Sequence, residues 1–360
     1  MTAWIVRAVC LGLAFALAAC NGPGPRRRHA RRQRPVQETL PTQPDTTAQV
    51  SDSLHYLPPV VDERVRQVPA QLARAVKQNP EANLPRLVSF LIQDRLTDSA
   101  KVRVIHDWMA DNIVYDVQGY LSGHLPGGSP ADVLRTGKSV CQGFGNLFEQ
   151  MCKLAGLECV TVSGYGRGYS FRLFETEDLT KSNHAWDAVR IDGRWRLVDV
   201  TWDAGYVEGG RYIKEYSLDH FLAEPSAFVF THFPEDQAWQ LMRPALGVQQ
   251  FTNLPFLRGG FWTYGLKFTT AFSRVNRAED EVEFAVLAPP NVSVLAGLLR
   301  EDETKIPGAT TVRRKGGVYC LTVKFPGPGR WIVRLYAKAG PPSGMHHAVA
   351  DLGFLPSILP

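Results

Sequence analysis

A cysteine, a histidine and an aspartate, in that order along the chain, stand in local sequence that suits a catalytic role. Cys141 opens an apolar pattern with helical spacing, and His184 and Asp199 lie in two alternating segments joined by Asp192-Gly193. A thiolate is a strong nucleophile, an imidazole can take the thiol proton, and a carboxylate can orient the imidazole. These residue types predict a cysteine-nucleophile enzyme acting on amide bonds, with Cys141, His184 and Asp199 as its catalytic residues.

The helix expected to begin at or just after Cys141 favours the charged form of the thiol. A free thiol has a pKa of about 8.5, and the unpaired N–H groups and dipole of a first helical turn stabilise a thiolate. The backbone N–H of Cys141 is a candidate oxyanion-hole donor, and Gly143 and Gly145 are expected to let a substrate backbone approach. Gly156 is expected to end the helix. Its expected apolar face consists of Phe144, Leu147, Phe148, Met151, Leu154 and Ala155.

The Asp192-Gly193 pair gives a geometric test of the other two residues. It predicts a two-residue turn between strands at about 184–191 and 194–201, which pairs the last residue of one strand with the first of the next. In this register His184 and Asp199 share a face as diagonal neighbours, about 7–8 Å apart along the backbone. A three-residue loop would turn Asp199 to the opposite face.

Each residue alone has an ordinary structural explanation. A buried cysteine is usually an inert small hydrophobe, a strand histidine is often a core residue, and an aspartate is often a surface carboxylate. The combination favours the enzyme interpretation. Trp186 and Trp202 are expected beside the pair, where they either shape a cleft or only pack. The remaining histidines of this part of the chain find no comparable thiol partner and are expected to be structural or exposed: His106, His124, His220, His232, His346 and His347.

Helices and one loop are expected ahead of the cysteine. The pattern predicts helices at about 62–78, 84–95 and 99–112, the last capped by Thr97 or Asp98. Residues 119–130 are rich in glycine and proline and are expected to form a loop bordering the cleft. A further strand is expected at about 157–164, directly after the cysteine-bearing helix.

After about residue 250 the pattern changes to short alternating segments separated by glycine and proline. Segments at 281–287, 292–299, 317–324 and 330–338 predict a β-sandwich over 251–360. It carries no catalytic constellation and is expected to be a packing or binding module. We therefore expect an α+β catalytic domain at 61–250, with the helix-borne cysteine packed on an antiparallel sheet, followed by this sandwich.

The N-terminus is expected to direct export and anchoring. Residues 1–20 have an apolar run that ends Leu17-Ala18-Ala19-Cys20, which resembles the lipobox of bacterial lipoproteins. Cys20 is then the lipidation site, residues 21–60 a disordered tether, and the location the bacterial cell envelope with a lipid anchor in the membrane. An ordinary secretory signal with a chance cysteine is the alternative.

Composition excludes several function classes. Of the 360 residues, six arginines fall between Arg26 and Arg34, so the net charge of +5 is concentrated in the tether and does not indicate nucleic-acid binding. No CxxC pair suggests zinc, and no acidic loop has EF-hand spacing, so no metal or other cofactor is expected. If Cys10 and Cys20 are set aside and Cys141 is a working thiol, the cysteines left are odd in number, which excludes a full disulfide framework.

Three stretches resemble the transglutaminase-like superfamily, most closely its bacterial members related to kyphoscoliosis peptidase. They are Lys101–Asp116, Gly137–Tyr165 and Asn183–Gly205, and His220–Met242 resembles the segment after the core in that group. The resemblance implies a papain-like core with Cys141 as nucleophile, His184 as general base and acid, and Asp199 as the orienting carboxylate. The C-terminal region is similar to the immunoglobulin-like extensions of such cores.

The implied chemistry forms a thioester with a protein or peptide substrate. Water as acceptor makes a protease or amidase, and an amine makes a transglutaminase. The sequence does not choose between these, nor does it give the natural substrate or the oligomeric state. A peptidoglycan-peptide amidase shares the chemistry, and the alternative from another class is a non-catalytic scaffold or binding protein with the same fold.

Overall fold

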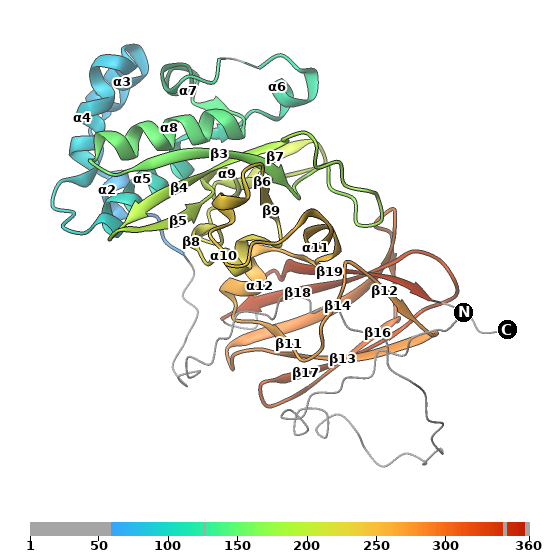
Figure 1. The fold of residues 1–360 in the computed structure, drawn as a ribbon. Helices are drawn as coiled ribbons and strands as arrows, with labels where there is room; N and C mark the ends of the chain where they lie inside the picture. Colours follow the sequence, from blue (N-terminus) through green and yellow to red (C-terminus); the bar gives the residue numbers. More distant parts are fainter. Residues whose placement is uncertain (1–58, 126, 341–343, 357–360) are drawn as a thin grey trace. The chain divides into compact units, whose positions relative to one another are not determined.

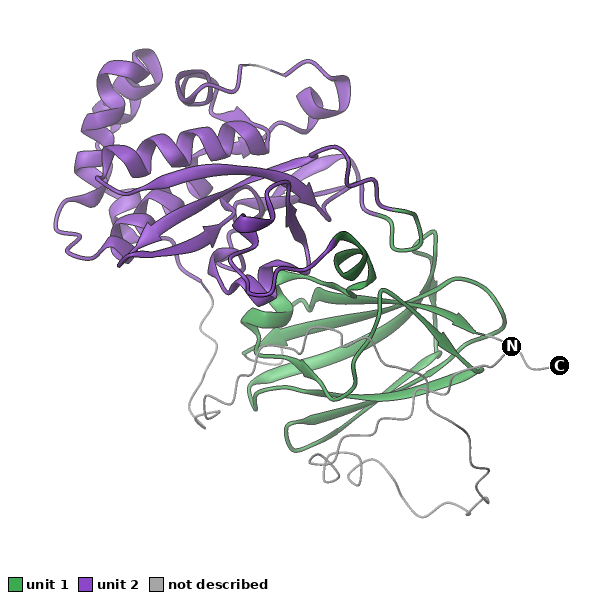
Figure 2. Ribbon diagram, viewed as in Figure 1, with its two compact units in different colours: residues 1–57, 172–176, 248–360 green, residues 58–171, 177–247 purple. Residues whose placement is uncertain are grey.

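A computed structural model describes residues 59–125, 127–340 and 344–356 of the chain. The described chain divides into two compact units, one of residues 58–171 and 177–247 and one that includes 172–176 and 248–360 (Figure 2). The signal segment, Cys20 and the tether lie outside the described residues. Within the described ranges, no helix is both long enough and apolar enough to cross a membrane.

Helices make up the N-terminal half of the first unit. The expected helix at 62–78 is broken by Pro69, which precedes the second of two helices. The expected helix at 84–95 begins earlier, because Asn79 caps it and Pro80 fits its first position. The loop expected at 119–130 contains a short helix. In order the helices are α2 Glu63–Arg66, α3 Ala70–Gln78, α4 Pro80–Ile92, α5 Asp98–Asn112, α6 Val117–Ser122, α7 Pro130–Thr136 and α8 Cys141–Leu154.

Helix α8 packs on an antiparallel sheet and joins it to the other helices (Figure 1). Phe144, Leu147, Phe148 and Met151 are buried as its apolar periodicity predicts, whereas Leu154 is exposed at the helix end. The buried face shares one core with α4 and α5. This burial fixes the helix, and with it Cys141, against the sheet.

The sheet of this unit has five strands in the order β8-β5-β4-β3-β9. Their bounds are β3 Cys159–Gly166, β4 His184–Ile191, β5 Arg194–Val198, β8 Phe221–Ala223 and β9 His232–Pro234. Ile191 pairs with Arg194 and Asp187 with Val198, so the predicted hairpin register is confirmed. The second strand is shorter than predicted, since β5 ends at Val198 instead of residue 201. A separate hairpin, β6 Gly205–Glu208 with β7 Arg211–Lys214, follows.

The second unit is built on two mainly antiparallel sheets, as the alternating pattern predicts. One has the strand order β10-β19-β18-β14-β15, with β12 paired in parallel beside β19, and the other β11-β13-β17-β16. Aromatic side chains such as Phe268, Phe272 and Phe284 contact one another in its interior. The main strands are β13 Glu281–Leu287, β14 Val292–Arg300, β16 Thr310–Lys315, β17 Val318–Lys324, β18 Trp331–Ala339 and β19 His347–Pro356. Shorter strands are β10 Phe256–Leu257, β11 Lys267–Phe268, β12 Val275–Ala278 and β15 Lys305–Ile306, and its short helices are α11 Val248–Asn253 and α12 Gly259–Thr263. The short helices α9 Val200–Asp203 and α10 Pro225–Phe228 belong to the first unit.

Candidate active site

Cys141 is the first residue of α8, where the sequence places it. Its backbone enters from β2 Lys138–Ser139, which pairs in parallel with β1 Val114–Tyr115 and so fixes the approach to the helix. In the first turn of a helix the N–H groups have no intrahelical acceptor. The thiol therefore stands beside unpaired donors and the positive end of the helix dipole, and both favour negative charge.

His184 and Asp199 lie in direct contact. His184 Nε2 is 2.7 Å from Asp199 Oδ2, and both side chains are buried. Asp199 is not a strand residue as predicted: it caps α9, and its Oδ1 accepts hydrogen bonds from the N–H groups of Thr201 and Trp202 at 2.9 and 3.3 Å. The cap competes with continued pairing to β4 and ends β5, yet it leaves Oδ2 directed at the imidazole.

The His184 ring also interacts with the Cys141 thiol. Burial raises the pKa of this thiol, but the hydrogen bond and charge interaction with His184, with a further hydrogen bond from the backbone of Ala185, outweigh burial and lower it. Burial lowers the pKa of His184, but the charges and hydrogen bonds of Asp199 and Cys141 together outweigh it and raise that pKa to about 10. Since Nε2 is engaged by Asp199, Nδ1 is the nitrogen available to the thiol. The interaction between these two groups thus lowers the pKa of the thiol and raises the pKa of the imidazole.

Glycines on β3 make room for the imidazole. A Cβ added to Gly166 would lie 2.9 Å from Cβ and Cδ2 of His184, so any side chain there would displace the ring. At Gly164, an added Cβ would meet Trp186 and the backbone of Phe233 at 2.5 Å. Gly164 and Gly166 thus leave space on the last part of β3 for the rings that pack against it.

The glycines of α8 have a different role from the one predicted. A Cβ on Gly143 would meet Ser139 Oγ at 2.0 Å, and one on Gly145 would meet Thr161 Cγ2 at 2.7 Å. Both glycines are buried. They allow the helix to pack closely on its neighbours, so the prediction that they admit a substrate backbone was wrong.

A second histidine contacts the same carboxylate. His232 Nε2 lies 3.2 Å from Asp199 Oδ2, and both side chains are buried. The sequence predicts only a structural or exposed position for this histidine. Its contact with Asp199 depends on the pairing of its strand, β9, with β3, which lies far from it along the chain. The Trp202 ring stacks on His184 with 4.9 Å between centroids, so this tryptophan covers the imidazole.

A further carboxylate near the site also joins two histidines. Asp203 Oδ2 lies 3.1 Å from His106 Nε2, and its Oδ1 lies 3.1 Å from His220 Nδ1. His106 Nδ1 in turn contacts Asp107 Oδ1 at 2.9 Å. Burial raises the pKa of Asp203, but the hydrogen bonds and charges of these two histidines together outweigh it and lower that pKa to about 2. The expectation of structural roles for His106 and His220 fits these buried contacts, although no local pattern indicates their shared partner.

His184, Asp199 and His232 also have the composition of a metal site, with ligand atoms within 4.8 Å of one another. Both rings contact Oδ2 directly, and backbone N–H groups occupy Oδ1. Each polar atom of the carboxylate thus has a hydrogen-bond partner without an ion. The cluster is satisfied as a hydrogen-bonded unit.

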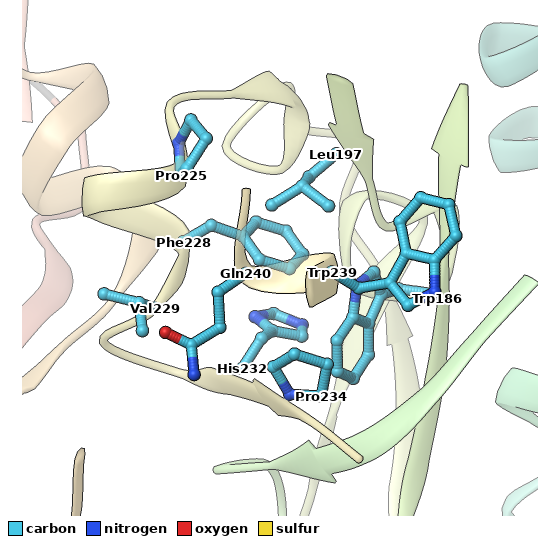
Figure 3. A pocket seen from close by; sticks show the side chains of 9 residues that line it. All are labelled: Trp186, Leu197, Pro225, Phe228, Val229, His232, Pro234, Trp239 and Gln240. Atoms are coloured by element: carbon cyan, nitrogen blue, oxygen red, sulfur yellow. The ribbon is translucent and has the colours of Figure 1, made fainter. Parts of the chain in front are cut away.

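A small pocket lies beside His232, lined by residues from strands, helix α10 and the turns near it (Figure 3). Its walls include Trp186, Phe228, His232 and Trp239, and the space does not admit a water molecule. The Phe228 ring stacks on His232 at 3.9 Å between centroids. The pocket is packing around the second histidine and offers no room for a substrate.

Comparison with known families finds a match in the region that contains the site. Residues 86–200, which contain the cysteine, the histidine and the aspartate described above, match the family described as the transglutaminase-like superfamily. Over these residues the core of this chain is similar to that superfamily. Residues 248–352 match the KY-like, immunoglobulin-like domain, which agrees with the two sheets of the second unit. The transglutaminase-like core and the immunoglobulin-like domain are thus both as the sequence resemblance predicts.

Curated relatives of this transglutaminase-like chain include kyphoscoliosis peptidases. The mouse protein is 36% identical over 196 residues, covering 54% of this chain and 30% of its own length. The human protein is 37% identical over 188 residues, covering 52% and 28%. The match therefore spans less than a third of each of these two relatives. A solved structure of a TGase is 19% identical, covers 43% of this chain and 38% of its own, and has a TM-score of 0.28.

Proposed function

We propose that this protein is a cysteine-nucleophile enzyme that acts on amide bonds of proteins or peptides through a thioester. The observation that carries the proposal is the imidazole of His184, which contacts the Asp199 carboxylate through Nε2 and whose interaction with the Cys141 thiol lowers the thiol pKa. A binding groove has no need of a thiol with a lowered pKa, an imidazole with a raised pKa and a buried carboxylate in one contact chain. This argues against a purely non-catalytic scaffold.

The reaction has two halves. The Cys141 thiolate attacks the amide carbonyl, and His184 gives its Nδ1 proton to the leaving amine, which produces a thioester. Asp199 keeps the ring oriented and stabilises its charged form. An acceptor then attacks the thioester carbonyl and gives its proton to Nδ1 of His184. The C–S bond breaks, and release of the Cys141 thiolate restores the thiolate–imidazolium pair. The backbone N–H of Cys141 is placed to donate to the oxyanion.

The acceptor decides between hydrolysis and acyl transfer. Mass spectrometry of candidate peptides incubated with the protein, with and without an added primary amine, distinguishes the two. A loss of ammonia with addition of water, or peptide cleavage, indicates hydrolysis, and incorporation of the amine indicates transamidation. Products that persist in a Cys141→Ser variant would contradict the proposal.

Alkylation tests the nucleophile without a known substrate. At pH 6 we expect iodoacetamide to label Cys141 at least tenfold faster than a free thiol, and His184→Ala to remove this advantage. Cys152 and Cys159 are free thiols and serve as internal controls, because both are buried away from the reagent. Labelling of Cys141 no faster than a free thiol would remove the basis of the enzyme assignment.

We also propose that the protein is anchored in the bacterial envelope through lipid on Cys20. The lipobox-like segment that ends at this cysteine and the polar stretch after it support the proposal. Partitioning into a detergent phase, lost in Cys20→Ala, is expected. A wild-type protein that stays in the aqueous phase after expression in a bacterium would contradict the anchor.

A further inference from the structure

The rings of His184 and His232 both contact Oδ2 of Asp199, on either side of the glycine-containing end of β3. In the sheet, Gly164 is the partner of His184 and Gly166 is the partner of His232, so the two histidines stand on opposite sides of the same strand. Their ring centroids are 5.4 Å apart. Both Nε2 atoms meet Asp199 Oδ2, at 2.7 and 3.2 Å.

The surroundings of His232 fix which of its nitrogens carries the proton. Burial lowers the pKa of His232 to about 3, so the ring is neutral and has a single N–H. An ionised carboxylate only accepts hydrogen bonds, so Nε2 must be the donor toward Asp199. Nδ1 then accepts a hydrogen bond from Thr231 Oγ1, which lies 2.9 Å away.

The two histidines are therefore not interchangeable. His184 and Asp199 face His232, and His220 also lies near it, with 5.6 Å between ring centroids. Burial lowers the pKa of His232, and the charges of His184 and His220 lower it further, so that together they outweigh Asp199, which raises it. Phe228 stacks on the ring and holds its plane. His232 stays a neutral donor while His184 takes the charge.

We propose that His232 is a positioning residue whose Nε2–H holds Oδ2 of Asp199 in the orientation that receives the Nε2–H of His184. The inference rests on the proposed function, since it assigns a support to the same three catalytic residues. A carboxylate that caps α9 through Oδ1 alone can still rotate Oδ2 away from the imidazole. The second donor removes this freedom and keeps the buried carboxylate ionised.

Substitutions that keep or remove the Nε2–H donor of His232 distinguish a positioning role of this residue from a packing role. His232→Leu removes the N–H, whereas His232→Gln retains an N–H donor at the end of a side chain that reaches a similar position. The readout is the rate of Cys141 alkylation by iodoacetamide from pH 4 to pH 9, which needs no substrate. We expect His232→Leu to slow alkylation at pH 6 at least tenfold. We also expect it to move the acid limb, the low-pH range in which the alkylation rate falls, to higher pH, because a poorly held Asp199 stabilises the imidazolium less.

The matched variants should differ according to whether a hydrogen-bond donor to Asp199 remains at residue 232. His232→Gln is expected to stay within about threefold of wild type, and Phe228→Leu, which removes the stacking ring but no donor, is expected to lower stability with the acid limb unmoved. Equal loss in His232→Leu and His232→Gln, or an unmoved acid limb in His232→Leu, would overturn the inference. Slow alkylation in the wild type itself would instead contradict the proposed function.

One measurement does not depend on the folding of any variant. Nitrogen-15 NMR of the wild-type imidazoles at pH 6 should show His232 as a neutral ring protonated at Nε2. Thr231→Val, which removes the hydroxyl donor to Nδ1, should weaken this tautomer preference. A His232 ring protonated at Nδ1, or charged at this pH, would overturn the positioning role.

Discussion

Asp199 and Asp203 lie four residues apart around α9, and each carboxylate contacts two histidine rings. Asp199 contacts the histidine that interacts with the thiol, whereas the Asp203 cluster extends to Asp107 in the interior. Similar hydrogen-bond chemistry thus occurs twice in one short segment. The two carboxylates should nevertheless respond differently to substitution.

We expect Asp203→Asn to act on stability and Asp199→Asn to act on reactivity. Asp203 accepts hydrogen bonds from Ser217 Oγ and from the backbone N–H of His220 in addition to its two rings. Removing the charge between buried imidazoles should lower the free energy of unfolding by about 3 kcal/mol. Asp199→Asn should instead slow Cys141 alkylation at pH 6 by on the order of a hundredfold, because the amide no longer supports the imidazolium.

Urea unfolding and alkylation rates, measured on the same preparations, check this division. The Asp203 variant should retain the acid limb of the wild-type alkylation profile at a temperature where it is folded. A large fall in reactivity in folded Asp203→Asn, without a change in stability, would contradict the structural role of this cluster.

The stability of the fold should fall with acid in two windows. Asp203 has a folded pKa of about 2, below its unfolded value of about 3.9, so its contribution is present above pH 4 and lost as the pH falls toward 2. His232 has a folded pKa of about 3, below its unfolded value of about 6.5. The unfolded chain therefore binds this proton first, and stability declines as the pH falls from 6.5 toward 3.

Variants of His232 and Asp203 show which of these two residues causes the loss of stability in each pH range. The free energy of unfolding by urea should depend less on pH between 6.5 and 4 in His232→Gln, and less between 4 and 2 in Asp203→Asn. A wild-type stability that does not change between pH 6.5 and 4 would mean that the His232 ring is not held neutral in the fold.

The site could be predicted from sequence where its geometry depends on neighbours along the chain. The turn at Asp192-Gly193 sets the register of β4 and β5, and that register brings His184 toward Asp199. The end of β5 could not be predicted, because the Asp199 side chain captures the first N–H groups of α9 instead of continuing the strand. The local sequence pattern does not show whether residues 199–201 continue the strand or begin a helix capped by Asp199.

The support around the site depends on long-range pairing, which local sequence does not reveal. His232 reaches Asp199 only because β9 joins the sheet beside β3, and His106 reaches Asp203 from a helix about a hundred residues earlier. The sequence predicts substrate access at Gly145, yet this glycine faces Thr161, a contact that the helical pattern of α8 alone does not contain. Strand order and helix-to-sheet contact are properties of the folded chain.

Gly166 gives the sharpest steric test of the imidazole position. A Cβ at this residue would lie 2.9 Å from Cβ and Cδ2 of His184, closer than real Cβ contacts allow, so the ring or the strand must shift. We expect Gly166→Ala to cost about 1–3 kcal/mol of stability and to slow Cys141 alkylation at pH 6 at least tenfold. Gly128→Ala is the matched control, since its added Cβ would meet only Asn146 Nδ2, at 3.9 Å. If Gly166→Ala reacted at the wild-type rate, the His184 ring would have to tolerate displacement, and the close crossing of β3 would then serve the packing of the sheet alone.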